Sequence, residues 1–127
     1  MLGKSKGFSG FSVDDPEKAK KFYGDILGLK VKKEEMEGLF SLKISGGNTV
    51  FVYPKENHEP ATFTILNFPV AAVEKKIDEM VLKGIQFEQY DTKDIKTDSK
   101  GIFRGGGPLI AWFKDSAGNI LSIIEQE

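Results

Sequence analysis

The chain has no cysteine, and its only histidine is His58. The lack of cysteine excludes disulfides, thiolate catalysis and cysteine-ligated zinc. With a single imidazole, the chain has only one side chain that ordinarily titrates near neutral pH and could act as a general acid or base. His58 is a candidate general base, but the nearby sequence offers no side chain that would orient it.

An excess of charge of one sign and long apolar runs are also lacking. The 127 residues include 18 basic and 19 acidic side chains, which gives a net charge of −1. The chain therefore lacks the excess of positive charge that is typical of proteins that bind nucleic acid or an anionic membrane. No apolar run approaches the roughly 20 residues of a membrane span, and the residues after Met1 lack the apolar core of a signal peptide. We therefore predict a cytoplasmic protein that binds neither nucleic acid nor membrane.

What remains is the composition of an ordinary globular protein, with 39% hydrophobic, 11% aromatic and 29% charged residues. Apolar patterns predict two helices, which begin near Pro16 and Val73 and end near Gly28 and Gly84. Asp14 or Asp15 is expected to cap the first helix. Strands are predicted over residues 8–13, 29–35, 39–45, 49–53, 62–68, 85–90, 109–114 and 120–124.

The second half of the chain repeats the first. Residues 13–18 align with residues 70–75, and residues 47–52 align with residues 118–123. Each half alone is too small to bury both faces of its sheet. The pattern predicts an α+β fold of two tandem βαβββ modules, at about residues 7–54 and 61–125, within a single domain of residues 1–127. The modules either pair within one chain or are exchanged between two chains.

The segment of residues 91–107 has no counterpart in the first half. It is long, polar and rich in glycine, which is typical either of a lid over a binding site or of a merely flexible connection. Arg104 lies among its glycines and either binds an anion or is solvated. The three successive glycines after Arg104 lack the lysine and Ser/Thr of a phosphate-binding loop.

Two stretches point to a known family. FSVDDPEKAKKFYGDILGLKV (residues 11–31) and AWFKDSAGNILSIIEQE (residues 111–127) resemble the opening and closing segments of vicinal oxygen chelate proteins, the superfamily of glyoxalases, bleomycin resistance proteins and extradiol dioxygenases. The resemblance implies a curved, barrel-like mixed sheet with helices outside and a central cleft. It implies no single activity, because the family includes metalloenzymes as well as bleomycin-binding proteins that catalyse nothing.

The resemblance also implies where a metal would bind. Metalloenzymes of the family take one ligand from the first and one from the last strand of each module, and the matching positions here are Phe8, Phe51, Ile65 and Ser122. None of these side chains is a carboxylate, imidazole or thiolate donor. We therefore expect no metal, no cofactor and none of the family's catalysis. A metal would need other ligands, such as Glu56, His58 and Glu59 of a connector that otherwise reads as an exposed loop.

Alternation along the strands places one set of side chains on the face of the cleft. The predicted ligand-binding residues are Phe8, Ser12, Phe51, Tyr53, Phe63, Ile65, Asn67, Trp112 and Ser122, with Arg104 from the loop. An apolar, aromatic surface with a few polar groups is typical of a small-molecule site. We predict a protein that binds an apolar or aromatic small molecule without a metal, and we assign no residue a catalytic role.

Two alternatives stay open. The first is a metal-dependent lyase or dioxygenase of the same superfamily that uses non-standard ligands. The second is a structural or regulatory module in which these aromatic residues close the cleft by packing. The exposed sheet edges at the module ends favour a symmetric homodimer in either case.

Overall fold

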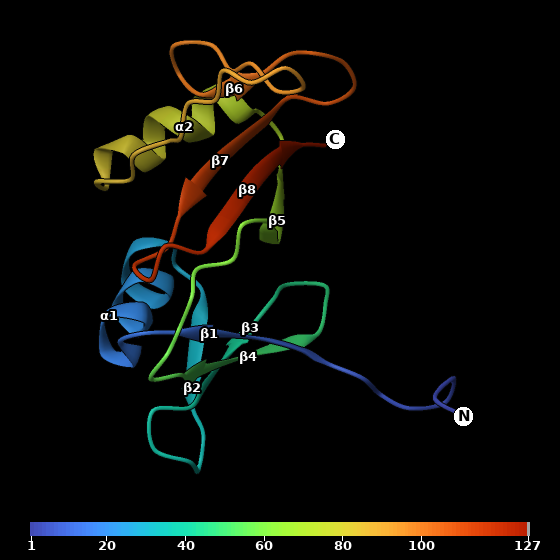
Figure 1. Ribbon diagram of the computed structural model, residues 1–127, viewed down its shortest axis with the longest axis vertical. Helices are drawn as coiled ribbons and strands as arrows, with labels where there is room; N and C mark the ends of the chain where they lie inside the picture. Colours follow the sequence, from blue (N-terminus) through green and yellow to red (C-terminus); the bar gives the residue numbers. More distant parts are fainter. Residues whose placement is uncertain (127) are drawn as a thin grey trace. The chain divides into compact units, whose positions relative to one another are not determined.

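The computed structural model describes residues 1–126 (Figure 1). Within these residues the chain forms eight strands, which lie in two four-stranded mixed sheets. The chain divides into two compact units, residues 1–59 and the residues from Pro60 onward. Each unit has the element order strand, helix, strand, strand, strand, so the predicted α+β fold of tandem βαβββ modules is confirmed.

The first unit contains one sheet and one helical segment. Its elements are β1 (Ser9–Val13), α1 (Pro16–Lys20), η1 (Lys21–Ile26), β2 (Lys30–Lys33), β3 (Phe40–Lys43) and β4 (Thr49–Pro54). The order across the sheet is β1-β4-β3-β2, with β1 parallel to β4 and the other pairs antiparallel. The last strand of the module therefore lies beside its first strand.

The helical segment begins at a side-chain cap. The carboxylate of Asp15 accepts hydrogen bonds from the backbone N–H groups of Glu17 and Lys18, as the sequence predicts. After Lys20 the helix continues as a π-helix, in which the N–H of Leu27 donates to the carbonyl of Phe22 at 2.9 Å. Gly28, with φ of 78°, ends it.

The helix covers one face of the first sheet. Ala19 and Tyr23 are fully buried, and the ring of Tyr23 lies 5.7 Å from that of Phe11 on β1. Because strand side chains alternate, Phe51 and Tyr53 of β4 lie on the opposite face, which we call the helix-free face.

The second unit repeats this topology. Its elements are β5 (Thr64–Val70), α2 (Val73–Leu82), β6 (Ile102–Phe103), β7 (Ile110–Lys114) and β8 (Ile120–Glu125). The order across the sheet is β5-β8-β7-β6, and β5 is parallel to β8 as β1 is to β4. The internal repeat seen in the sequence is thus a repeat of the strand order.

One predicted strand is wrong. Residues 85–90 contribute only an isolated bridge, between Phe87 and Phe113, and the edge strand β6 comes from the segment predicted to be irregular. The reason is burial: Ile102 of β6 is 0% exposed and pairs with Ala111. The edge beside β7 is therefore shared by two short pieces of chain, one before and one after the loop.

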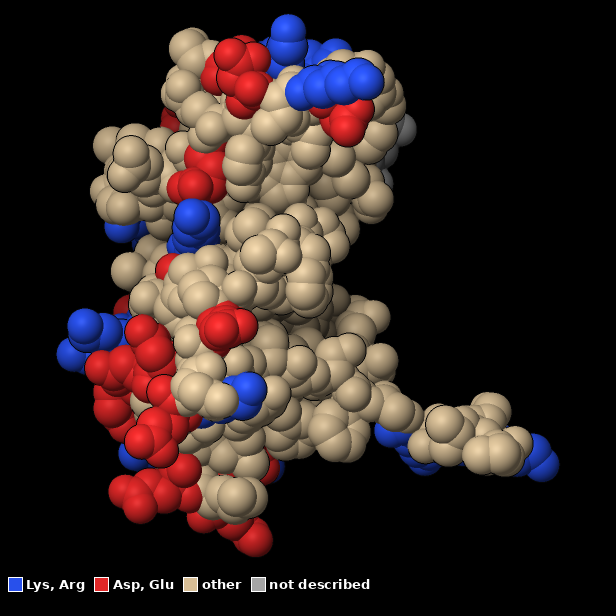
Figure 2. All heavy atoms as spheres, viewed as in Figure 1, with Lys and Arg blue, Asp and Glu red and all other residues tan. Residues whose placement is uncertain are grey.

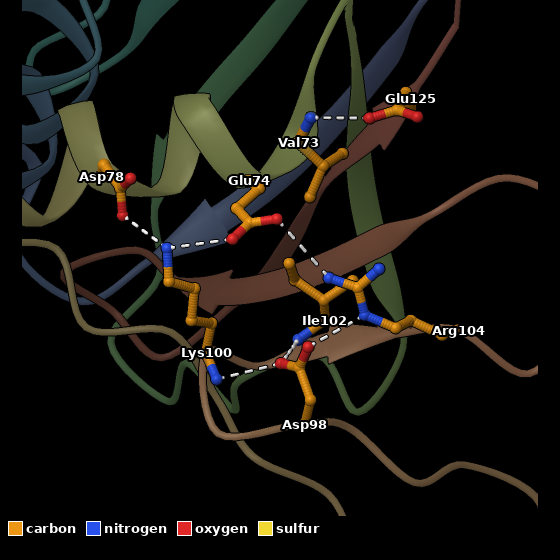
Figure 3. Close-up of polar contacts among 8 residues, drawn as sticks. All are labelled: Val73, Glu74, Asp78, Asp98, Lys100, Ile102, Arg104 and Glu125. Carbon is orange, nitrogen blue, oxygen red and sulfur yellow. Dashed lines mark hydrogen bonds and ion pairs between the residues drawn. The ribbon is translucent and has the colours of Figure 1, made fainter.

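The start of α2 shows how closely the helix depends on the sheet. Ala72 at the N-cap provides no side-chain acceptor, and the N–H of Val73 donates instead to the carboxylate of Glu125 on β8, at 2.9 Å (Figure 3). A carboxylate at a helix N-terminus is favourable because the helix dipole is positive there.

Charge is spread in both signs over the surface. Figure 2 shows basic and acidic side chains next to one another over the end of the second unit that carries β6, and acidic side chains gathered over the first unit. No helix within residues 1–126 is long and apolar enough to cross a bilayer.

Candidate functional site

Phe8 and Phe51 come together on the helix-free face of the first unit. Their ring centroids are 4.8 Å apart, and both rings line a pocket of about 450 Å³. The same pocket has charged walls, which include Lys32 and the Glu34 carboxylate that accepts a hydrogen bond from Ser41 at 2.8 Å. The predicted aromatic pair therefore lies in polar surroundings.

Ser12 and Tyr53, two further predicted residues, are neighbours across β1 and β4. Ser12 also has a partner that the sequence did not indicate: its Oγ lies 2.7 Å from Nδ1 of His58. The two residues are 46 positions apart in the chain, so no local pattern could have paired them. The fold thus gives His58 the orienting contact that its sequence neighbourhood lacks.

The second unit holds a more apolar pocket, which we call the aromatic pocket. Its volume is about 390 Å³, and its lining residues are Thr62, Phe63, Thr64, Tyr90, Thr92, Ile95, Trp112 and Ile120. Phe63 and Trp112 are predicted site residues. Every lining side chain is aromatic, aliphatic or a hydroxyl, and none carries a charge at neutral pH.

Trp112 of the aromatic pocket lies among other aromatic rings. Trp112 of β7 meets Tyr90 edge to face, with ring centroids 5.6 Å apart, and Phe103 of β6 lies 6.2 Å from the same indole. Edge-to-face rings contribute on the order of 1 kcal/mol beyond their buried area. Trp112 is therefore held by neighbours on two sides.

Burial raises the pKa of the Tyr90 phenol above its ordinary value of 10.0. The nearby Glu88 carboxylate raises this pKa further, and Lys114 acts in the opposite direction. The phenol is consequently neutral at physiological pH. It can donate one hydrogen bond into the pocket and contributes no charge.

A turn of residues 90–97 supplies Tyr90, Thr92 and Ile95 to the lining, and we call these three residues the loop wall. The turn is closed by hydrogen bonds between Thr92 and Ile95, and Thr97 donates its N–H to the Tyr90 carbonyl at 2.9 Å. The sequence prediction missed the loop wall. Its signals in the sequence are Tyr90, at the end of a predicted strand, and Ile95, in the polar segment that follows.

Ile65, Asn67 and Ser122 do not line the aromatic pocket. The pairing of β5 with β8 shifts between Thr64 and Leu66, so strict alternation fails at Ile65. Ser122, which is 0% exposed, donates its hydroxyl to Oδ1 of Asn67 at 2.6 Å. This pair satisfies a buried polar group of the sheet.

Arg104 lies beside α2, away from the aromatic pocket's lining. Its Nε donates to the Asp98 carboxylate at 3.0 Å, and its guanidinium lies 3.7 Å from Glu74 (Figure 3). Lys100 reaches Asp78 and Glu74 of the same helix at 3.0 and 3.4 Å. We call these five residues the ion network.

The side chains at the family's metal positions do not fit a metal. Phe8, Phe51 and Ile65 have no lone pair to offer, and the Ser122 hydroxyl donates to an amide. Among residues 1–126, His, Asp and Glu side chains nowhere gather in threes around a point where a metal ion could bind. We derive no chemistry through a metal.

A larger open groove of about 730 Å³ runs beside the C-terminal half of α2. Its lining includes Ile77, Val81 and Leu82 of the helix and Phe87 from the following segment. It contains none of the predicted site residues, and its aromatic content is one ring. The aromatic pocket is therefore the better candidate for a small-molecule site.

Comparison with known proteins places this geometry in a family. Residues 9–123 match the family model described as Glyoxalase/Bleomycin resistance protein/Dioxygenase superfamily. A search of curated proteins gave no match. Many solved structures share the fold, at identities low enough that the likeness concerns the fold alone.

Three of these structures illustrate the likeness. The glyoxalase family protein from Enterococcus faecalis is 20% identical, with a TM-score of 0.69, and 98% of this chain and 100% of that chain are covered. A superfamily member from Sphaerobacter thermophilus DSM 20745 is 18% identical, with a TM-score of 0.68 and coverage of 99% and 100%. TnmS3, an antibiotic binding protein from Streptomyces sp. CB03234, is 16% identical, with a TM-score of 0.67 and coverage of 100% and 99%.

Proposed function

The chain belongs to the Glyoxalase/Bleomycin resistance protein/Dioxygenase superfamily, and from this we propose that it binds an apolar, aromatic small molecule without the help of a metal. Membership alone does not choose between binding and catalysis, because one fold hosts many chemistries. The choice rests on the side chains of the site.

The aromatic pocket is the single observation that carries the proposal. Its volume of about 390 Å³ lies within the roughly 300–1,000 Å³ of typical ligand sites. Trp112, Tyr90 and Phe63 supply flat apolar surface to its lining. Rings arranged in this way can stack on or meet the edge of an aromatic ligand.

The lining also limits the charge of the ligand. No Lys, Arg, Asp or Glu lines the aromatic pocket, so an ionic ligand would lose its hydration without gaining a partner. Thr62 and Thr64 add two hydroxyls to the lining, which can form neutral hydrogen bonds. We therefore propose an uncharged, planar ligand with a few hydrogen-bonding groups.

A relative supports binding as an activity on this fold. TnmS3, 99% of whose chain is covered by the match, is described as an antibiotic binding protein. Binding of an antibiotic by the present chain is a hypothesis that this likeness motivates. It remains separate from the broader proposal of an aromatic ligand.

The test uses a property of the composition: Trp112 is the only tryptophan of the chain. We expect the uncharged dye N-phenyl-naphthylamine to quench the tryptophan fluorescence of the full chain, since any ligand in the aromatic pocket lies beside the indole. The quenching should saturate with a micromolar dissociation constant, on the order of 1–100 µM for a small apolar ligand.

Two variants make this test specific. Ile95→Ala enlarges the pocket and removes an apolar contact, and it should weaken binding about fourfold to fifteenfold, which corresponds to the burial of one or two CH₂ groups. Phe8→Ala changes the pocket of the first unit and should leave the dissociation constant unchanged. Absence of saturable quenching by any uncharged aromatic compound in a broad panel would overturn the proposal.

We also propose a cytoplasmic location, and from the exposed sheet edges we propose a symmetric homodimer. Light scattering after size-exclusion chromatography measures the second, and a single mass near 14.1 kDa would contradict it.

A further inference from the structure

Part of the loop wall of the aromatic pocket is exposed and lies outside the sheet. Thr92 is exposed and Ile95 is half-buried, and both belong to the turn of residues 90–97 and not to the sheet. The base of this turn is Thr97, whose hydroxyl accepts the N–H of Tyr90 at 2.8 Å. The position of Thr97 therefore fixes the position of the wall.

Asp98, the next residue, anchors that base. One oxygen of its carboxylate accepts the N–H groups of Lys100 and Ile102, both at 2.9 Å, and the other accepts Nε of Arg104. Burial alone would raise the pKa of Asp98, but these hydrogen bonds outweigh it and lower the pKa. The carboxylate is thus ionised, and it closes the turn of residues 98–102.

The ion network then connects this turn to α2. Arg104 reaches Glu74 on the helix, and Lys100 reaches Glu74 and Asp78, one helical turn apart (Figure 3). Two cations of the loop are thus paired with two carboxylates of the helix. A further ion pair, between Lys114 of β7 and Glu88, lies before the loop at 3.4 Å.

We propose that Asp98 and Arg104 position the loop wall of the aromatic pocket, so that ligand affinity falls when their ion pair is weakened. This inference rests on the proposed function, because it concerns the same pocket. It gives Arg104 a role other than the direct ligand contact predicted from the sequence. Loss of the ion pair between Asp98 and Arg104 loosens the base of the turn of residues 90–97. The loop wall then becomes mobile, and because the ligand must order it on binding, the binding free energy becomes less favourable.

Salt provides the first test, with the full chain, N-phenyl-naphthylamine and Trp112 fluorescence. The dye is uncharged, so its own contacts are not screened, and salting-out alone would strengthen apolar binding. We expect the opposite: weaker binding, by about threefold, when ionic strength rises from about 0.02 M to 0.5 M and screens exposed pairs.

Substitutions provide the second test. Asp98→Asn keeps an oxygen for the N–H groups of Lys100 and Ile102 but removes the charge, so it should weaken binding about twofold to fivefold, the upper part of the range for exposed ion pairs. Arg104→Gln should do the same, and Arg104→Lys should restore part of the affinity. Lys76→Gln is the matched control, because it removes an ion pair with Glu79 on α2 that does not reach the loop.

The outcomes separate this inference from the proposed function. Asp98→Asn and Arg104→Gln should also remove the salt dependence of dye binding. A parallel denaturation should show that the fraction of folded protein at the assay temperature is unchanged. If the unmodified chain binds the dye but neither salt nor Asp98→Asn changes its affinity, the positioning role is wrong, while the proposed binding in the aromatic pocket is supported. If neither the dye nor any other uncharged aromatic compound of the panel quenches the fluorescence of the unmodified chain, the proposed function itself fails.

Discussion

Tyr90 contributes to the aromatic pocket through its state of protonation as well as its ring. Its pKa is raised by burial first and by Glu88 second, against a smaller opposing effect of Lys114. A raised pKa of an acid means that the folded state holds the proton more tightly than the unfolded state does. The neutral form therefore persists in the fold to higher pH than in a free tyrosine.

This state gives a prediction at alkaline pH. Titration followed by phenolate absorbance should show Tyr90 ionising above pH 10.0, and the signal should be absent from Tyr90→Phe. Since the folded state binds more protons in this range, the free energy of unfolding should fall as pH rises above 10. The fall should be shallower in Tyr90→Phe. A Tyr90 signal below pH 10 would contradict the assigned burial.

Some residues of the site were predictable from the sequence and others were not. Phe63 and Trp112 follow from strand alternation, because each lies in or beside a regular strand and faces away from the helix. Tyr90 and Ile95 lie in a turn whose shape is set by hydrogen bonds to Thr97 and Thr92. No periodic pattern describes such a turn, so the sequence places Tyr90 at the end of a predicted strand and Ile95 in a predicted irregular segment.

Among the elements, the edge of the second sheet departs most from the sequence prediction. Both Phe87 and Ile102 reach β7, the first through a bridge and the second through β6. The chain returns to this edge through Gly101, which takes φ of 90°. The backbone passes so close to residue 88 that a Cβ at position 101 would lie 2.8 Å from the Glu88 carbonyl oxygen. The conformation and the space of this position both require glycine.

Gly84 offers a matched comparison for this element. It has a similar φ of 92°, but a Cβ there would meet no atom within 4 Å. Gly84→Ala should therefore cost about 1–2 kcal/mol, the penalty of a left-handed conformation. Gly101→Ala adds a clash with backbone and should cost clearly more, about 3 kcal/mol or above. Urea denaturation measures both, and equal costs would mean that the edge adjusts without strain.

The other elements were predictable because their signals are local. The N-cap at Asp15, the end of the helix at Gly28 and the turn that begins at Asp115 each depend on a few adjacent residues. The shift in pairing between Thr64 and Leu66 was not predictable, because β8 lies more than 50 residues further along the chain. Register between distant strands is a property of the fold and not of either strand.

At the scale of the whole molecule, the two units share a topology and differ in chemistry. The pocket of the first unit has Lys6, Lys32 and Glu34 in its lining, whereas the aromatic pocket of the second has no charged lining residue. The repeat therefore explains the strand order and not the binding surfaces. A sequence alignment of the halves could predict the former alone.

The predicted single domain can be tested through cooperativity. Each unit has about 60 residues and one helix for the two faces of its sheet, which is a marginal core for independent folding. We propose that the two units unfold together. A cavity in the first unit should then lower the stability reported by Trp112, which lies in the second.

Leu42→Ala provides that cavity, since Leu42 of β3 is 0% exposed. We expect a loss of about 2–5 kcal/mol in the free energy of unfolding, and the same shift in Trp112 fluorescence as in far-ultraviolet circular dichroism. Lys43→Ala, at an exposed position of the same strand, should shift neither signal by more than about 0.5 kcal/mol. An unchanged Trp112 transition in Leu42→Ala, beside a destabilised circular dichroism signal, would show instead that the units are independent domains.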